Sequence, residues 1–459
     1  MTRLRLFRLV AAVVVTGLLA SCAGFHYRYP SSREAEALLA RPMPAYPAAR
    51  FAVISDPHLY DTGLGIEGAA FEQYMERDRK LLPETHEILG EALARVRSLG
   101  AGFLLVCGDL TKDGEKQDHL LMAAQLEGLA RSGVRVFVVP GNHDINNPHA
   151  MSYSEKGATP VARVTPAEFA EIYRDFGYGE ALFRDPGSLS YVAEPVAGLW
   201  LLAVDSASYA HNAARGHPET GAGLTQGRID WMEEMLGEAR RQDKAVIVMM
   251  HHGVVEHFPG QAKYHGEYLV NDRLQVAAML AAYGVRVAFT GHFHAQDVTM
   301  TRTGAGGVLY DVETGSLASF PDPVRSVEIT ASQDMLIRSS FITEIPSFAA
   351  EGRSFEDFAR ESLHDNIGRI AIRTMKGLGI PEPEAMTIAP QIADAYLAHY
   401  AGDERFTGTE MLRSKGLSLM AGIVVSSRRD LVAGLWRDLP PADNDLDISL
   451  DTGSWSPGR

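Results

Sequence analysis

Five short clusters of Asp, Asn and His side chains provide this sequence with candidate metal ligands. The clusters contain Asp56 and His58, Asp109, Asn142 and His143, His251 and His252, and His292 and His294. Two carboxylates, one amide and up to six imidazoles offer oxygen and nitrogen donors without a thiolate, a set that suits Zn, Mn or Fe. Seven ligands are too many for one ion but fit two ions that share a bridging carboxylate. Such a centre can clamp the attacking and leaving oxygens of an in-line displacement.

Each cluster comes directly after an apolar run that predicts a β-strand. The runs occupy residues 51–54, 103–106, 134–139, 245–250 and 285–290. Apolar residues at helical spacing predict helices at 84–99 and 116–131, between the first three runs. Alternating strands and helices are typical of a parallel sheet, and ligands bind at the carboxyl ends of such strands. We therefore expect an α/β fold in which the polar clusters meet at one sheet edge.

The rest of the chain first predicts further strands of this fold and then a helical region. A strand is expected at 199–204, and four runs between 297 and 342 predict antiparallel strands. Residues 344–437 predict a helical appendage, because apolar positions recur at helical spacing. Residues 438–459 are acidic and contain several Pro residues, which predicts a solvated tail.

The five clusters, in their order along the chain, resemble the motifs of a known enzyme family. They read Asp56-x-His58, Gly108-Asp109, Gly141-Asn142-His143-Asp144, His251 and Gly291-His292-x-His294. This series resembles the calcineurin-like metallophosphoesterases, over a domain at 50–343. Each motif is common by itself, but all five in order at strand ends form a specific signal. The resemblance implies a β-sandwich flanked by helices, with metal ions at the strand edge.

The resemblance also implies a role for each ligand. One metal ion, either divalent or trivalent, would be held by Asp56, His58 and His294. The other would be held by Asn142, His251 and His292. Asp109 would bridge the two ions, which are expected to be Mn, Fe or Zn. His252 is expected to pack or form hydrogen bonds instead, since neighbours on a strand face opposite sides.

Two further residues would take part in the reaction that the resemblance implies. His143 would bind the phosphate or protonate the leaving group, and Asp144 would orient His143. A hydroxide that bridges the metal ions would attack phosphorus in line. A small phosphodiester is the preferred substrate, because the histidine motifs resemble those of the phosphodiesterase branch. A phosphomonoesterase and a non-catalytic metal-binding lipoprotein of the same fold are the alternatives.

The loop after His251 contains His257, Tyr264, His265 and Tyr268. Two interpretations of this loop stay open. Its side chains could line the substrate pocket, or the loop could simply be exposed. Farther along, the segment Glu313-Thr314-Gly315-Ser316, followed by Arg325, could meet a phosphate oxygen, but an ordinary turn is the preferred interpretation.

The first residues predict a lipid anchor. Three Arg residues precede an apolar run at 9–20, which is typical of a signal peptide and short for a membrane-spanning helix. The run ends in Leu19-Ala20-Ser21-Cys22, which resembles the lipobox of bacterial lipoproteins. We therefore expect a signal peptide at 1–21, a lipid on Cys22 and a tether at 22–49. The expected location is the outer membrane, facing the periplasm; a cleaved signal with an incidental Cys is the alternative.

The net charge and the cysteine content argue against a nucleic-acid partner and against an internal disulfide. The formal net charge of -15 argues against a nucleic-acid polymer as the partner, because binding one requires a basic face. The chain has two Cys residues, and lipidation of Cys22 leaves only Cys107, so no internal disulfide is expected. The sequence does not indicate an oligomeric state.

Overall fold

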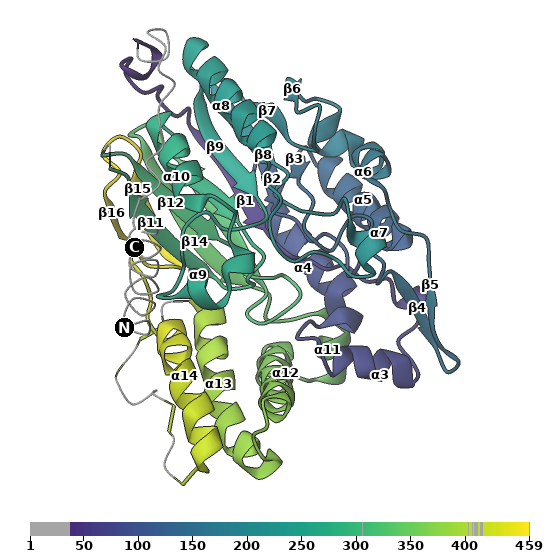
Figure 1. The fold of residues 1–459 in the computed structure, drawn as a ribbon. Helices are drawn as coiled ribbons and strands as arrows, with labels where there is room; N and C mark the ends of the chain where they lie inside the picture. The colour runs from purple at the N-terminus through teal and green to yellow at the C-terminus, as the bar shows by residue number, and fades with distance from the viewer. Residues whose placement is uncertain are drawn as a thin grey trace, which may run out of the picture.

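Two β-sheets packed face to face form the centre of the molecule (Figure 1). The computed structural model describes residues 37–458 apart from 305, 403, 406, 408–411 and 414–415. Within these residues, each of the two sheets has seven strands, and a separate hairpin has two. Phe51 of one sheet stacks on Phe103 and meets Phe289 of the other sheet edge to face, with ring centroids 4.6 and 5.4 Å apart. These contacts make the space between the sheets an apolar core.

The first sheet combines parallel strands from the start of the chain with antiparallel strands from its later part. Its order is β16 (Trp455–Pro457), β15 (Asp445–Ser449), β14 (Asp334–Phe341), β13 (Pro323–Ile329), β1 (Ala49–Ile54), β2 (Phe103–Val106) and β3 (Arg135–Val138). The strands β1, β2 and β3 are parallel, as predicted, whereas β1 and β13 are antiparallel. The carboxyl ends of the three parallel strands therefore share one edge.

The second sheet is mostly parallel where it carries the remaining clusters. Its order is β11 (Asp297–Arg302), β12 (Val308–Glu313), β10 (Val287–Thr290), β9 (Ala245–Met250), β8 (Leu199–Val204), β7 (Tyr191–Val196) and β6 (Phe183–Arg184). The strands β8, β9, β10 and β12 run parallel to their neighbours in this series. The separate hairpin consists of β4 (Met151–Ser154) and β5 (Gly157–Pro160).

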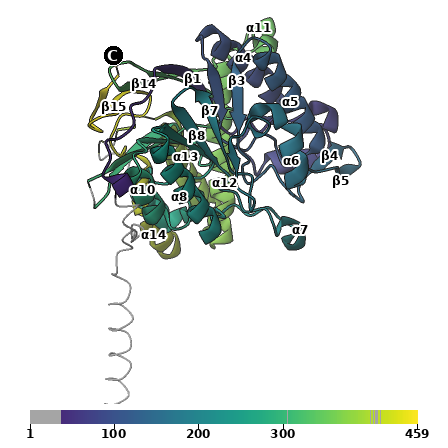
Figure 2. The same ribbon diagram turned by 90° about the horizontal axis from the view of Figure 1, so that it is seen from above.

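Helices cover the outer faces of both sheets (Figure 2). The helices α4 (Thr85–Ser98) and α5 (Lys116–Ala130) pack on the first sheet, and α6 (Pro166–Ile172) packs on α5. The helices α8 (Gln226–Arg241) and α10 (Arg273–Ala282) pack on the second sheet. Of the short helices, α3 (Ala69–Met75) contacts the β4–β5 hairpin, α9 (Gln261–Tyr264) contacts α14, and α7 (Asn212–Arg215) lies apart from both sheets. Met232 of α8 and Met279 of α10 are buried in one apolar cluster with Trp200 of β8. The predicted α/β sandwich flanked by helices is confirmed.

The predicted helical region follows as a group of helices beside the sandwich, at the bottom of Figure 1. It consists of α11 (Pro346–Glu351), α12 (Phe355–Gly377), α13 (Glu382–Ala401) and α14 (Leu419–Leu435). The Ser354 side chain accepts a hydrogen bond from Asp357 N–H and caps α12. Tyr400 of α13 accepts a hydrogen bond at its carbonyl from Gln296 N–H, so the helices are joined directly to the sandwich.

The expectation of a solvated tail at 438–459 is wrong. Within that segment, β15 pairs with β14 and β16 pairs with β15, so both strands extend the first sheet. Leu446, Ile448 and Leu450 are buried. Alternate residues of a strand point to opposite faces, so the Asp side chains between these positions can face outward while the apolar ones face the core. The acidic composition therefore concealed a strand.

The described part of the predicted tether also packs against the sandwich. Leu38 and Tyr46 are buried, and the Tyr46 hydroxyl donates to Val246 O at 3.0 Å. Arg240 of α8 donates to the carbonyls of Leu38 and Arg41. The predicted signal peptide at 1–21 and Cys22 lie outside the described residues. Among the residues described, no helix has both the length and the apolar character required to span a bilayer.

Candidate metal centre

The seven predicted metal ligands come from loops that directly follow β1, β2, β3, β9 and β10. Five of these ligands have a left-handed backbone conformation, which is uncommon outside glycine. They are Asp56 (φ 50°), His58 (φ 39°), Asp109 (φ 48°), His292 (φ 79°) and His294 (φ 73°). Such conformations cost on the order of 1 kcal/mol or more each and persist where the surroundings determine them. The fold therefore stabilises a strained arrangement of ligands.

Close backbone approach explains two glycines of the motifs. A Cβ atom on Gly141 would lie 2.1 Å from Asp109 Oδ1, and one on Gly291 would lie 2.4 Å from Asp56 Oδ2. Both distances are shorter than any van der Waals contact, so a larger residue would displace a ligand carboxylate. The Gly-Asn-His and Gly-His-x-His patterns thus have a steric reason.

The first predicted ligand group converges on a small space. His58 Nε2 and His294 Nε2 are 3.2 Å apart, and His294 Nε2 is 3.3 Å from Asp56 Oδ1. Asp56 Oδ1 is buried and has no hydrogen-bond partner. Burial is the main cause that lowers the pKa values of both histidines, which favours the neutral imidazole that a metal requires. A bound cation would satisfy all three groups, so they fit the first ion.

The second group has the same character. His251 Nε2 lies 3.1 Å from Asn142 Oδ1, and the buried His292 Nε2 has no hydrogen-bond partner. His251 Nδ1–H donates to Cys107 O at 2.9 Å, which directs Nε2 toward the centre. Burial lowers the pKa of His251, but the carboxylates of Asp109 and Asp56 outweigh it and raise this pKa to about 10. The site therefore attracts positive charge, which a second ion would supply.

Asp109 lies between the two groups, as the predicted bridge requires. Its Oδ2 atom is 3.6 Å from His58 Nε2 and 3.3 Å from His251 Nε2. Its Oδ1 atom accepts a hydrogen bond from His143 N–H at 2.8 Å. The carboxylate is thus held by the backbone on one side and can face both ions with the other. The residues present fit a dinuclear metal centre.

The partner of His143 differs from the one predicted. His143 Nδ1–H donates to Asp113 Oδ1 at 2.9 Å, whereas Asp144 accepts hydrogen bonds from the backbone N–H groups of Gly141, Leu110 and Thr111. The assignment of Asp144 as the residue that orients His143 is therefore wrong. Asp144 holds the loops after β2 and β3 together. The prediction failed because the neighbouring side chains of His143 and Asp144 point in different directions. The Asp144 carboxylate points toward the backbone of the loop after β2.

Asp113 was not recognised from the sequence. Its carboxylate accepts hydrogen bonds from Lys112 Nζ at 2.6 Å and from the Tyr74 hydroxyl at 3.0 Å. Its position four residues after Asp109, just before a helix, is a signal that could have been used. Burial lowers the pKa of His143, but the Asp109 and Asp113 carboxylates outweigh it and raise this pKa. His143 is thus favoured as a proton-bearing, cationic side chain.

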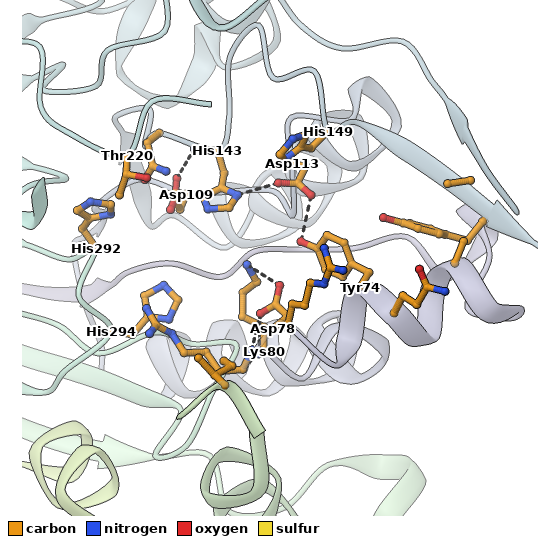
Figure 3. A pocket seen from close by; sticks show the side chains of 18 of the residues that line it. Tyr74, Asp78, Lys80, Asp109, Asp113, His143, His149, Thr220, His292 and His294 are labelled. Atoms are coloured by element: carbon orange, nitrogen blue, oxygen red, sulfur yellow. Dashed lines mark hydrogen bonds and ion pairs between the residues drawn. The ribbon is translucent and has the colours of Figure 1, made fainter. Parts of the chain in front are cut away.

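A cavity of about 740 Å³ borders the metal ligands, and Figure 3 shows Asp109, His143, His292 and His294 around it. The His143 side chain is 24% exposed, so it can meet a molecule in this cavity. The wall also contains Arg77, Asp78, Arg79 and Lys80, of which Lys80 is paired with Asp78 at 3.0 Å. The two arginines therefore provide the positive charge beside the metal ligands.

The loop after His251 divides between two roles. Tyr268 lines the cavity, and its ring lies 4.5 Å from the His292 ring. His257 is buried elsewhere, in contact with Asp297. His252 uses both ring nitrogens, with Ser206 Oγ and Thr220 O as partners, which confirms the expected hydrogen-bonding role. Arg325 and Glu313 are buried, and Arg325 donates to the Glu313 carbonyl, which favours the structural interpretation.

Of the comparisons with known proteins, the one with family models bears on this geometry. The family model for the calcineurin-like phosphoesterases matches residues 49–296, which is more than half of the chain. Comparison with curated proteins gave no match. Among solved structures, a dimetal phosphatase from Danio rerio is 11% identical with a TM-score of 0.44, over 64% of this chain and 97% of that chain. A purple acid phosphatase from yellow lupin (Lupinus luteus) seeds is 13% identical with a TM-score of 0.39, over 69% of this chain and 54% of that chain. With the family model spanning all five ligand clusters, the chain belongs to the calcineurin-like phosphoesterases, metal-dependent hydrolases of phosphoester bonds.

Proposed function

We propose that this protein hydrolyses a phosphodiester in the cavity beside the metal centre. The observation that supports it best is that both ligand groups border one cavity and that His143, which is not a predicted ligand, also faces it. Asp56, His58 and His294 would hold one ion and Asn142, His251 and His292 the other, with Asp109 between them. When bound, the two ions would activate water as the nucleophile and offset negative charge on the phosphoryl oxygens. Mn, Fe and Zn suit these donors.

His143 has the surroundings of a proton donor. Its ring faces the cavity, and Asp113 fixes its Nδ1–H, so Nε2–H is the atom that can reach the substrate. Donation from Nε2–H to the leaving oxygen would assist departure of an alkoxide, while the same N–H could instead only bind a phosphoryl oxygen. The two roles differ in their dependence on the leaving group.

The size and lining of the cavity favour a diester over a monoester. A diester carries an organic group on each side of phosphorus, and the cavity of about 740 Å³ is in the range of pockets that enclose whole small molecules. Tyr74, Tyr153 and Tyr268 provide aromatic surface along its wall. Arg77 and Arg79 would attract an anionic substrate, although this charge also suits a monoester.

Hydrolysis of two aryl esters by the metal-loaded protein tests the proposal. We expect kcat/KM for bis(p-nitrophenyl) phosphate to exceed that for p-nitrophenyl phosphate, with Asp109→Asn as the control for contaminating phosphatases. Faster hydrolysis of the monoester would make the protein a phosphomonoesterase. Failure to hydrolyse either ester with both ions bound would instead favour the non-catalytic alternative.

We further propose that a lipid on Cys22 anchors the protein to the outer membrane, facing the periplasm. The support is the sequence of the signal peptide and its Leu-Ala-Ser-Cys ending. A single acyl chain binds membranes only marginally, so more than one chain is expected. Incorporation of radiolabelled fatty acid should occur in the wild type and be absent from Cys22→Ala. Labelling of the variant would show that another residue carries the lipid.

A further inference from the structure

A second buried cluster of carboxylates and imidazoles lies where α13 meets the edge of the second sheet. We refer to it as the β11–α13 cluster; its members are His257, Asp297, Asp311, Glu313, His399 and Glu404. All six side chains are buried, and Glu404, the most exposed of them, is only 7% exposed. The match to the calcineurin-like phosphoesterase family ends at residue 296. Five of the six cluster residues follow that position, so the cluster lies mostly outside the segment that the family shares.

Three of these residues bring ligand atoms together. His399 Nδ1 lies 2.8 Å from Glu404 Oε1 and 3.6 Å from Asp297 Oδ2. One ligand atom from each of the three residues lies within 4.8 Å of the others, as in the two groups of the catalytic centre. His257 Nδ1–H donates to Asp297 Oδ1 at 2.7 Å, the kind of outer hydrogen bond that orients a metal-binding carboxylate.

The hydrogen bonds of these three residues are incomplete. The His399 nitrogen that faces Glu404 and Asp297 is Nδ1, whereas the unpartnered nitrogen is Nε2. Asp297 Oδ2, Glu404 Oε2 and His399 Nε2 are buried and have no hydrogen-bond partner. Nearly all buried polar atoms in proteins have one, and a bound cation would supply a partner for the two carboxylate oxygens. Asp311 provides the contrast, because its carboxylate accepts from Val254 N–H, Val255 N–H and the Thr290 hydroxyl. Asp311 is satisfied by protein, whereas the Asp297 and Glu404 carboxylates are not.

The charge of the cluster also favours a cation. Four carboxylates face at most two imidazolium groups, and the Arg325 guanidinium, which donates to Glu313 O at 2.6 Å, adds one more positive charge. At least one negative charge therefore lacks a counter-charge when every carboxylate is ionised. An excess of negative charge can be met by a proton or by a metal ion, and the unpaired atoms of Asp297 and Glu404 favour the ion.

We propose that Asp297, His399 and Glu404 bind a structural divalent metal ion, Zn²⁺ by preference, that fastens the helical appendage to the catalytic domain. Carboxylate and imidazole donors suit Zn²⁺, and a closed, buried position is typical of structural rather than catalytic sites. Asp297 belongs to β11, whereas His399 lies on α13 and Glu404 follows it, so the ion joins two parts of the chain.

This joint lies directly behind two ligands of the catalytic centre. The ring of Phe293, which stands between His292 and His294, lies 5.6 Å from the His399 ring and 6.4 Å from the Tyr400 ring. The backbone N–H of Gln296 donates to Tyr400 O at 3.2 Å. The ion would therefore hold α13 against the loop that carries both histidines.

Metal counting on the intact protein tests the site. After chelation and dialysis, the wild type titrated with Zn²⁺ should bind three equivalents per chain, measured by elemental analysis after removal of free metal. His399→Gln should bind two, while His211→Gln, the same change at an exposed histidine, should bind three. Saturation of the wild type at two equivalents, or three equivalents in His399→Gln, would overturn the proposal.

A second variant guards against misfolding of His399→Gln. Glu404→Gln changes one ligand in the segment after α13 and removes charge without changing shape. It should also bind two equivalents, and it should lose part of the rise in Tm that Zn²⁺ gives the wild type. A Zn²⁺-dependent rise in Tm equal to that of the wild type, with three equivalents bound, would mean that the cluster shares protons rather than a metal ion.

Discussion

The catalytic centre and the β11–α13 cluster are built from the same kinds of side chain on very different backbones. The catalytic ligands follow strands in loops, and five of the seven have a positive φ. Asp297, His399 and Glu404, all described residues, have ordinary φ values, and the first two belong to a regular strand and helix. Only the catalytic centre borders the cavity. Backbone strain thus accompanies the predicted ligands beside the cavity, while the buried cluster forms on residues with ordinary φ values.

Two kinds of support also distinguish the regions. In the catalytic centre, outer residues such as Asp113 and Asp144 hold loops and a proton-bearing histidine in place. In the β11–α13 cluster, the outer residue His257 donates to Asp297 and lies 3.5 Å from the Asp311 and Glu313 carboxylates. Variants should therefore affect activity strongly in the first region and stability in the second.

The largest effect is expected for Asp109→Asn, which removes the charge that faces both ligand groups. Loss of a central electrostatic element typically lowers kcat by about 10²–10³-fold, and loss of metal should add to this. Hydrolysis of bis(p-nitrophenyl) phosphate and metal content should both fall, whereas the exposed control Asp175→Asn should behave as wild type. Wild-type turnover with unchanged metal content would remove Asp109 from the catalytic centre.

The next largest loss of activity is expected for His143→Ala, and the size of this loss should depend on the leaving group. General acid catalysis contributes about 10²–10⁴-fold where protonation is required, which applies to an alkoxide but much less to an aryl oxide. Measurement of kcat/KM for alkyl and activated aryl diesters distinguishes proton donation from phosphate binding by His143. His86→Ala on α4 serves as the control. Equal losses on both esters would mean that His143 only binds phosphate, and loss of metal would make it a ligand.

Asp113→Asn should have an intermediate effect, because it acts through His143. Removal of an outer residue that orients a functional histidine lowers activity by about 10–100-fold. The double variant with His143→Ala should be no slower than His143→Ala alone, since the positioned group is already absent. Additive losses in this cycle would contradict the positioning role of Asp113 and assign it a separate function.

The smallest effect on activity is expected for His399→Gln in the β11–α13 cluster. With saturating metal, its kcat/KM should stay close to wild type, while its thermal stability should respond less to Zn²⁺. A ligand at about 100 times its Kd stabilises the folded state by about 2.7 kcal/mol, and this increment should disappear. Calorimetry with and without Zn²⁺ measures it. A large loss of activity at unchanged stability would reverse the distinction between the two regions.

Local patterns in the sequence were sufficient to predict the sandwich and the polar clusters that meet at its edge. Each ligand follows a short apolar run, and the helix expected at 84–99 is observed as α4. The role given to Asp144 was wrong because side-chain direction within a turn depends on the whole loop. The segment at 438–459 was misjudged because its net acidity outweighed the alternation of Leu446, Ile448 and Leu450.

The β11–α13 cluster could not be predicted, for a related reason. Asp297 and His399 are separated by about a hundred residues and carry no motif that links them. Their contact depends on how α13 packs against β11, which is a tertiary property. His257 was noted in its loop, but only the fold separates it from Tyr268, which lines the cavity.

The strands β15 and β16 determine which backbone groups the first sheet presents to other molecules. Without them, the eight-residue strand β14 would leave its unpaired N–H and C=O groups open to pairing with another chain. With them, the outermost strand is β16, which has three residues and ends in Pro457. Proline lacks the N–H group that a neighbouring strand would need, and short edge strands offer little length for addition. A chain shortened before residue 445 should therefore aggregate through β14, even though every catalytic ligand would still be present.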